Sequence, residues 1–378
     1  MHIGSGILQI PSRNKSIIIV SALVIIIAVS LIMFNDFVTF NTPEDDEVKL
    51  YSFALVGVTI SFAVLFHFWR VGRGLSESRN EKVGNFLRLS FGSLWVLDGI
   101  LQLQPEMSNG FISNVVLPVI NGFPAFLRPY FNFITVTWMA HPVLYDSFSA
   151  IIQIAIGSGM LIFRGGHRLN AILLLSIIWG IIVWVFGEGF GGVISPGASF
   201  LTGFPGSALV YVMVSFVLLL RLEEHSKTRV ISLFMVIVFS LSALEQALPS
   251  NGFWAYGGIP PIPGGMASNV QPFQLQNLLY WFSSVFSGSF TIWNSVFVAL
   301  FVAIAIFWLF NLRFAPYLTI LASIFIWCVF QDFGVLGGFG TDPNTALPML
   351  LLSLSVIISQ HPPNVYLTQE RYKNTQSQ

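Results

Sequence analysis

The chain has 378 residues, of which 54% are hydrophobic and only 9% are charged. Soluble domains carry about 25% charged residues, so this chain lacks the side chains that would cover a surface facing water. The composition predicts an all-α integral membrane protein. The single cysteine, Cys328, excludes an internal disulfide, a Cys-x-x-Cys redox pair and a thiolate cluster within the chain.

Apolar runs long enough to cross a bilayer recur along the whole chain. A transmembrane helix takes roughly 20 residues, and we count about ten such runs. They lie at 16–35, 50–69, 86–103, 144–163, 169–188, 207–222, 230–248, 288–310, 314–332 and 345–360. The sixth and tenth runs are short, and their ends are the least defined.

Positive charge is distributed unevenly between the two sides of this predicted bundle. Of the 17 Lys and Arg residues, all but Lys49 and Arg128 precede the first run or follow an even-numbered one. Cytoplasmic loops of membrane proteins are enriched in Lys and Arg. The charge pattern therefore predicts a multi-pass protein of the cell membrane with both termini in the cytoplasm.

The second half of the chain repeats a pattern of the first half. The tetrapeptide Ser-Asn-Gly-Phe occurs at 108–111 and at 250–253, each time after an apolar run and after a Gln and a Pro that are three residues apart. A displacement of 144 residues carries Gln102 onto Gln246. We therefore predict two copies of a four-span unit. Because four is even, the copies would have the same orientation and form two parallel four-helix bundles.

The repeat divides the chain into four predicted domains. They are a two-span extension at 1–85, a first unit at 86–228, a second unit at 229–362 and a polar cytoplasmic tail at 363–378. Each unit has one long aromatic loop on the outer side. We expect either short helices lying at the outer interface or a packed cap over the bundle.

The third apolar run resembles a known helix. It reads R-L-S-F-G-S-L-W-V-L-D-G-I-L-Q-L at 88–103, with Arg at its cytoplasmic start and an acidic residue, Gly and Gln before a Pro. This is similar to the first helix of the DoxX family, whose four-span members include the DoxD-type subunit of thiosulfate:quinone oxidoreductase. The resemblance covers 86–222 and, more weakly, 230–360. It implies a four-helix bundle and a role beside quinone or other redox subunits.

The second unit and the cysteine content depart from that pattern. Ser232 stands where the first unit has Arg88, and Ser242-Ala243 stands where it has Asp98-Gly99. Family members that work with thiols carry cysteines, which this chain does not offer at matching positions. The resemblance therefore supports the fold more than any particular activity.

Ionisable residues inside a membrane are costly, so each one is a candidate for function. Asp98 and Gln102 lie four residues apart and share one helix face. Gln246, with Ser242, repeats the arrangement without the charge, whereas Glu245 lies outside the repeated pattern. Two interpretations stay open: an outward-facing pocket for a headgroup, a quinone or a proton, or hydrogen bonds between neighbouring helices.

Glu188 and Asp332 are candidates of a second kind. The displacement of 144 residues carries one onto the other, and both lie at the outer C-terminal end of a run. A carboxylate there meets the negative end of the helix dipole. We expect them to be protonated, to bind a cation, or to pair with Arg128 or Lys49. As a hypothesis, they mark twin outer pockets; the glycines that follow them equally suit helix caps.

The sequence contains no self-contained catalytic set. It has no P-loop, no nucleotide fingerprint, no G-x-S-x-G and no H-E-x-x-H motif, and His67 has no partner histidine at its depth. We assign no catalytic residue and no metal ligand. The first hypothesis is a quinone-facing or accessory subunit of a membrane redox system, with the lipid bilayer and other redox subunits as partners and no nucleic acid. The alternatives are a small-solute permease with its site between the two repeats and a purely structural assembly subunit.

Overall fold

A computed structural model describes residues 82–104, 107, 110–269, 271–336 and 339–360. Every regular element within these ranges is helical. The first two predicted spans, Lys49, His67 and the predicted tail lie outside the described residues.

The helices of the first predicted unit are α3 (Lys82–Leu101), η2 (Ile112–Val116), α5 (Leu117–Asn121), α6 (Arg128–Ala140), α7 (Pro142–Ile162), α8 (Gly166–Ile182), η3 (Val183–Gly187), η4 (Phe190–Gly192), η5 (Phe200–Thr202) and α9 (Ser207–Leu219). Those that follow are α10 (Glu224–Ala247), η6 (Pro249–Asn251), α11 (Pro261–Met266), α12 (Phe273–Gly288), α13 (Phe290–Leu309), α14 (Ala315–Val329), η7 (Asp332–Gly334) and α15 (Ala346–Gln360). Every apolar run predicted from residue 86 onward falls on a helix.

Four helices in the described part of the chain are long and apolar enough to cross a membrane. They are Leu144–Ile162, Gly166–Gly187, Glu224–Ala247 and Phe290–Leu309. The helices α9, α14 and α15 are apolar but shorter. The predicted span at 86–103 is a helix of 20 residues, α3, but it carries Arg88 and Asp98 and is not one of the four. These lengths and compositions are those of a membrane protein.

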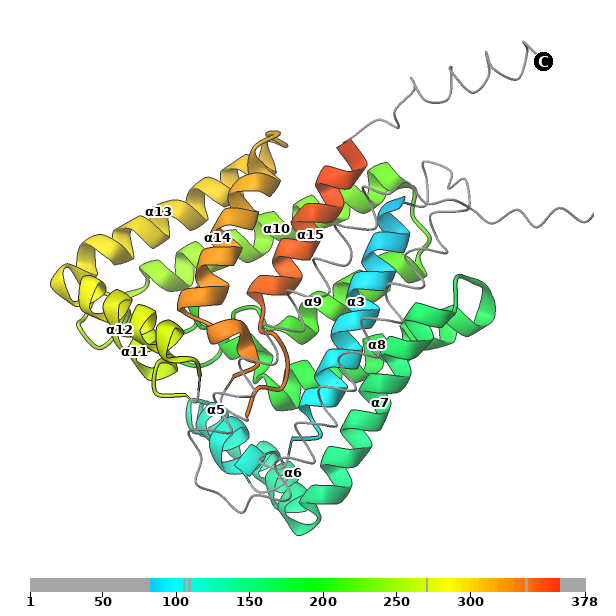
Figure 1. Ribbon diagram of the computed structural model, residues 1–378, viewed down its shortest axis with the longest axis horizontal. Helices are drawn as coiled ribbons and strands as arrows, with labels where there is room; N and C mark the ends of the chain where they lie inside the picture. The colour runs from blue at the N-terminus through cyan, green and yellow to red at the C-terminus, as the bar shows by residue number, and fades with distance from the viewer. Residues whose placement is uncertain (1–81, 105–106, 108–109, 270, 337–338, 361–378) are drawn as a thin grey trace, which may run out of the picture.

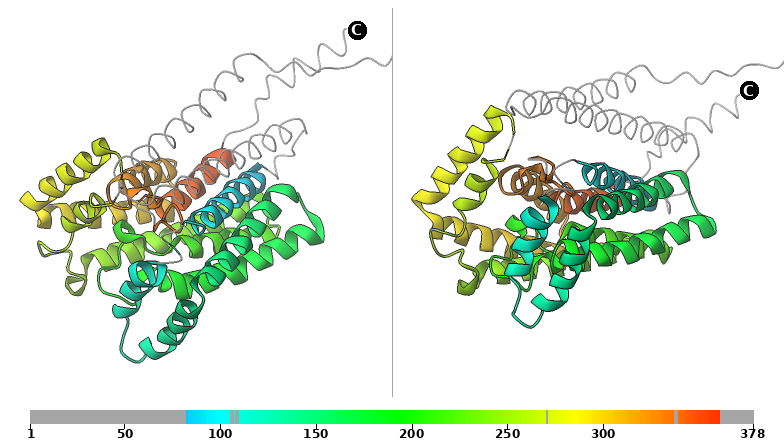
Figure 2. Two further views of the ribbon diagram at one scale, coloured as in Figure 1. Left: turned by 60° about the horizontal axis from the view of Figure 1, so that its bottom comes forward. Right: turned by 90° about the horizontal axis from the view of Figure 1, so that it is seen from below.

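The helices pack as pairs, α3 with α7, α8 with α9, α10 with α13, and α14 with α15 (Figure 1). The last helix, α15, also contacts α3, α9 and α10, and so joins the two parts of the chain. The shorter helices α5 and α6 lie together at the lower end of the bundle in Figure 1, and Figure 2 shows them projecting from it.

Glycines allow α3 and α7 to approach one another through their backbones. A Cβ atom at Gly157 would lie 2.5 Å from the carbonyl oxygen of Gly92, and one at Gly99 would lie 2.9 Å from that of Ala150. Small residues at such crossings are the usual means of close helix packing in membranes. This close contact aligns the polar residues of α3 with those of α7.

Arg88 closes the other end of the same helix pair. Its guanidinium is buried and donates to the carbonyl oxygens of Met160, Leu161 and Phe163, at the C-terminal end of α7. The last carbonyls of a helix have no partner within the helix, and a cation there also complements the helix dipole. Arg88 is therefore explained by helix capping.

The two predicted outer loops contain the helix pairs α5–α6 and α11–α12. One face of α6 buries Phe131 and Thr135, and Phe131 packs edge-on against Phe123 at 4.6 Å between ring centroids. The opposite face exposes Tyr130 and Phe133. The segment is thus a packed cap over the bundle that also presents an aromatic outer surface.

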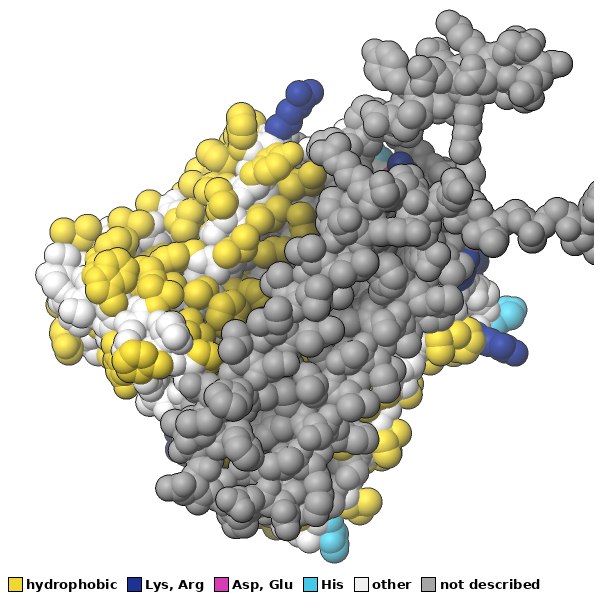
Figure 3. Space-filling model, in the orientation of Figure 1, with side chains coloured by type: hydrophobic (Ala, Val, Ile, Leu, Met, Phe, Trp, Pro, Cys, Tyr) yellow, Lys and Arg dark blue, Asp and Glu magenta, His cyan; other side chains and the backbone are white. Residues whose placement is uncertain are grey.

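Apolar side chains cover much of the described surface. Ile292 is 63% exposed and Leu321 is 66% exposed, and Figure 3 shows hydrophobic side chains spread over the described part of one face, with Lys, Arg and His side chains at its margin. A continuous exposed apolar surface of this kind requires contact with lipid or with another apolar surface.

Candidate functional site

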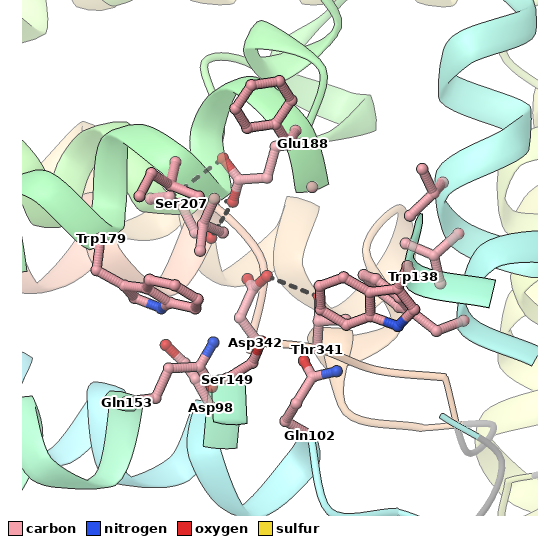
Figure 4. Close-up of a pocket in the computed structure, with 18 of the residues that line it drawn as sticks. Asp98, Gln102, Trp138, Ser149, Gln153, Trp179, Glu188, Ser207, Thr341 and Asp342 are labelled. Atoms are coloured by element: carbon pink, nitrogen blue, oxygen red, sulfur yellow. Dashed lines mark hydrogen bonds between the residues drawn. The ribbon is translucent and has the colours of Figure 1, made fainter. Parts of the chain in front are cut away.

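A cavity of about 110 Å³ lies where the C-terminal end of α3 meets α7, α9 and η3, with η2 and α6 also contributing to its lining (Figure 4). Three carboxyl groups line it: Asp98 from α3, Glu188 just after η3, and Asp342 from the loop that precedes α15. The sequence places these residues far apart, and the helix pairing brings them to one chamber.

Glu188 is held at the N-terminus of α9. Its Oε1 accepts a hydrogen bond from Ser207 Oγ at 2.6 Å and one from the Ala208 amide at 3.0 Å. The sequence suggested an unfavourable position at the negative end of its own helix. The turn after η3 instead directs the carboxyl to the positive end of the next helix, where an acceptor is favourable.

Two glycines make that turn and that contact possible. Gly191 has a φ of 66°, and a Cβ atom there would collide with the carbonyl of Pro205. Gly206 has a φ of 95°, and a Cβ atom there would collide with the Glu188 carboxyl. Only glycine meets both demands, a left-handed backbone and close approach.

Burial and mutual repulsion favour the protonated forms of the two loop carboxyls. Burial, and next the nearby Asp342 carboxyl, raise the pKa of Glu188 from 4.5 to about 8. Burial also raises the pKa of Asp342, while hydrogen bonds from Ser207, the Asn344 amide and Thr341 act in the opposite direction. Near neutral pH the pair therefore keeps a proton.

Asp98 forms the floor of the cavity. It is 3% exposed, interacts with the Tyr211 hydroxyl, and is close enough to Asp342 and Glu188 to be repelled by both. Tyr211 itself is fixed by edge-on packing against Trp95, with 4.9 Å between the ring centroids. The third carboxyl thus lies beside a tightly packed aromatic side chain.

The two glutamines that follow α3, Gln102 and Gln104, make different contacts. Gln102 lines the cavity and donates to Asp146 Oδ1 on α7 at 2.9 Å. Gln104 donates to the carbonyl of Gly340 at 2.9 Å. The second bond ties the loop that carries Asp342 to the end of α3 and so helps to complete the chamber.

Aromatic and amide groups form the remaining walls. The indoles of Trp95, Trp138 and Trp179 line the cavity together with Gln153. Trp179 Nε1 and Gln153 Oε1 are buried and have no hydrogen-bond partner among the described residues, and Gln153 is only 5% exposed. Buried polar groups are rarely left unpaired, so these atoms indicate a place for a ligand or for water.

No cationic side chain offsets the carboxyls of the cavity. Its lining, which is drawn from the described residues, contains no Lys, Arg or His. Arg128 was a candidate partner, but it donates to the carbonyls of Phe123 and Asn121, at 2.9 and 3.0 Å, and does not line the cavity. No group of three or more His, Cys, Asp or Glu residues in the described ranges could hold a metal ion.

Asp332 lies away from this cavity. It is 2% exposed and accepts hydrogen bonds from Asn269 and Gln271, each at 3.2 Å. Burial raises its pKa to about 6. The hypothesis of twin pockets placed it beside a site like that of Glu188, but only Glu188 lines the cavity described here.

The contacts pair Glu188 with Gln331 rather than with Asp332. Gln331 Oε1 accepts from the Ala346 amide at 3.0 Å, at the start of α15, as Glu188 does at the start of α9. The residues that follow each of them have matching positive φ angles: 55°, 60° and 66° for Gly189, Phe190 and Gly191, and 47°, 58° and 69° for Asp332, Phe333 and Gly334. The displacement here is therefore 143 residues, one fewer than the sequence comparison used.

The remaining candidates have structural partners outside the cavity. Gln246 is fully buried, accepts from the Ser199 hydroxyl and donates to Asn294 Oδ1 at 2.6 Å. Glu245 accepts from Asn251 at 2.6 Å. For these two positions, hydrogen bonding between neighbouring segments accounts for the polar residue.

Sequence reasoning missed several residues of the site. Asp342 lies in a Thr-Asp-Pro-Asn turn that reads as an ordinary loop, and Ser207 and Tyr211 lie in an apolar helix. Ser149 and Gln153 both line the cavity, and their spacing of four residues on α7 was an available signal for a polar face.

Comparison with protein families, with curated proteins and with solved structures finds no match to this chain. The site must therefore be interpreted from its own chemistry. It combines three carboxyl groups with aromatic faces, and within the described residues it has no cationic side chain and holds one donor and one acceptor without a partner. Such a chamber suits a small ligand that carries positive charge or donates hydrogen bonds.

Proposed function

We propose that this protein is a membrane permease for small organic cations. The observation that carries the proposal is the cavity with Asp98, Glu188 and Asp342 in its lining, aromatic side chains in its walls and no cationic side chain in its described lining. An alkylammonium ion offsets buried carboxylates and is attracted to the faces of Trp and Tyr rings, and each such contact contributes about 0.5–2 kcal/mol.

The proposed architecture has about ten transmembrane helices and two parallel four-span units. Corresponding contacts support the repeat: Trp184 Nε1 donates to the carbonyl of Pro205 at 2.8 Å, and Trp327 Nε1 donates to that of Pro343 at 2.6 Å. The first unit supplies most of the cavity and the second supplies Asp342. A site built by both units suits a permease whose units move relative to each other.

The proposed orientation places the cavity toward the outer side. Asp98 lies near the C-terminal end of α3, opposite Lys82 at its start. On α7, the cavity residues Ser149 and Gln153 likewise precede the end that leads to Arg164. With the Lys and Arg side in the cytoplasm, both termini would be cytoplasmic and the cavity accessible from outside.

Uptake by proteoliposomes tests this proposal. Labelled choline should enter vesicles that contain the full-length protein faster than protein-free vesicles, and unlabelled choline should compete. Dimethylbutanol, the uncharged carbon analogue of choline, should not compete. Vesicles that take up no choline above the protein-free background would contradict a permease for organic cations.

The quinone hypothesis is a second candidate, because the same cavity offers flat aromatic walls and the amides of Gln102 and Gln153. Together with the DoxX resemblance, these features suit a quinone ring in an accessory subunit of a redox system. A water-soluble quinone analogue serves as the discriminating probe. Saturable binding of the analogue, without competition from choline, would favour the redox subunit over the permease.

A further inference from the structure

Glu188 and Asp342 approach one another across the cavity with Ser207 beside them (Figure 4). The Ser207 hydroxyl hydrogen-bonds Glu188 at 2.6 Å and also interacts with Asp342. A single hydroxyl has one proton to donate, so it cannot serve two ionised carboxylates at once. When both carboxyls are ionised, the contact of Ser207 with one of them therefore has no proton.

Gln331, which makes the corresponding contact at the start of α15, has both an acceptor and a donor. Gln331 accepts from the Ala346 amide through Oε1, and its Nε2 donates to the carbonyl of Phe200 at 2.9 Å. The amide therefore provides an acceptor on one side and a donor on the other. Glu188 provides both only when it is protonated.

The surroundings of the pair do not supply a positive charge. Among the described residues, the titratable groups that face it are Asp98 from α3 and Tyr211 from α9. The α7 wall contributes the neutral Ser149 and Gln153, and the second of these has a buried acceptor without a partner. Either a proton or a cationic ligand must therefore offset the charge of the two carboxyls.

Resting on the proposed function, we infer that the organic cation and a proton compete for the Glu188–Asp342 pair, so that each cation bound displaces one proton. The charge in the cavity is then unchanged by the exchange. In a permease this makes cation transport an exchange against protons. The raised pKa of Glu188, about 8 through burial and the neighbouring Asp342, allows the pair to hold that proton at neutral pH.

Calorimetry of choline binding to the purified full-length protein tests the inference directly. At pH 7, the apparent binding enthalpy measured in buffers of different ionisation enthalpy gives the number of protons released. We expect about one proton per bound choline, and an affinity that rises about tenfold from pH 6 to 7 and about fivefold from pH 7 to 8.

The variants separate the pair from its surroundings. Glu188→Gln should bind choline without releasing a proton, and its affinity should change less than about twofold between pH 6 and 8. The amide at position 331 indicates that glutamine is accommodated in this contact. Asp342→Asn provides a second test, and Glu245→Gln, outside the cavity, should behave like the wild type.

Two results would overturn the inference in different ways. Choline that binds the wild type without proton release would refute the exchange and leave the cation site in place. No saturable choline binding to the folded wild type would refute the cation site and the exchange together.

Discussion

Replacing Glu188 by glutamine should make the protein more stable at alkaline pH. The folded-state pKa of Glu188, about 8, lies above its ordinary value of 4.5. Between these two values the folded state binds more protons than the unfolded state, so the free energy of unfolding falls as the pH rises. The amide in Glu188→Gln keeps the acceptor for Ser207 and Ala208 but never ionises.

The structure sets the size of this effect. A pKa difference is worth about 1.4 kcal/mol per unit, so the interval from 4.5 to about 8 gives an upper limit of about 5 kcal/mol. Glu188 is partly exposed to the cavity, and water there reduces the cost of its charge. We expect about 1–3 kcal/mol of relative stabilisation of Glu188→Gln at pH 9, and almost none below pH 4.5.

Thermal unfolding in one detergent, from pH 4 to pH 9, measures this difference. The melting temperature of the wild type should fall relative to that of Glu188→Gln as the pH rises through the interval, and the gap should level off above about pH 8. Glu245→Gln controls for the loss of an acidic residue elsewhere. If the difference in melting temperature between wild type and Glu188→Gln stays constant from pH 4 to pH 9, Glu188 is not a buried carboxyl that is protonated at neutral pH.

Three further changes test other parts of the structure. Gly157→Val should lower stability by about 1–3 kcal/mol, because its Cβ would lie 2.5 Å from the Gly92 carbonyl oxygen, whereas a Cβ in Gly288→Ala meets no atom within 4 Å. Equal melting temperatures for the two variants would contradict the close α3–α7 contact. Asp332→Asn should leave choline affinity within about twofold of wild type, since Asp332 does not line the cavity, and a tenfold loss would contradict that assignment. Trp308→Phe should cost about 1 kcal/mol in thermal unfolding through the lost hydrogen bond to Thr319; an unchanged melting temperature would show that this bond contributes little.

Hydropathy predicted the positions of the helices because both the apolar runs and the helices result from contact with lipid. A segment that lies in lipid must satisfy its own backbone hydrogen bonds and present apolar side chains. The helix ends were less predictable. The run at 230–248 starts six residues after the beginning of α10 at Glu224, and the residues that it misses include Lys227 and Thr228. These residues are polar, so hydropathy stops before the helix does.

The site could be predicted only in part. Asp98, Gln102 and Glu188 were candidates because charge and amide groups are rare in apolar helices, and all three line the cavity. Asp342 could not be found in this way, since it lies in a polar turn where an acidic residue is ordinary. Its role arises from the tertiary structure, in which Gln104 holds its loop against α3.

The sequence alignment pairs Glu188 with Asp332, whereas the contacts pair Glu188 with Gln331, because residues of similar type need not make similar contacts. The strings V-F-G-E and V-F-Q-D align by type, but Gln331 makes the contact with the next helix. Asp332 occupies the left-handed position that Gly189 holds in the first unit. By backbone geometry, which the sequence comparison could not include, the residue that corresponds to Glu188 is the amide Gln331.

The predicted counterpart of Asp98 and Gln102, at Ser242 and Gln246, has different surroundings. Ser199, from the segment before α9, hydrogen-bonds Gln246, and Phe200 packs edge-on against Phe239 with 5.0 Å between the ring centroids. The segment before α9 thus packs against α10. This contact between segments distant in sequence explains why similar polar patterns on α3 and α10 have different surroundings.

Equilibrium binding of labelled choline to the purified wild-type protein tests the central claim most directly. The cavity, with three carboxyls and no cationic side chain in its described lining, predicts saturable binding of one choline per chain, displaced by tetramethylammonium and not by dimethylbutanol. Absence of saturable binding, or equal displacement by dimethylbutanol, would contradict a cation site in this cavity.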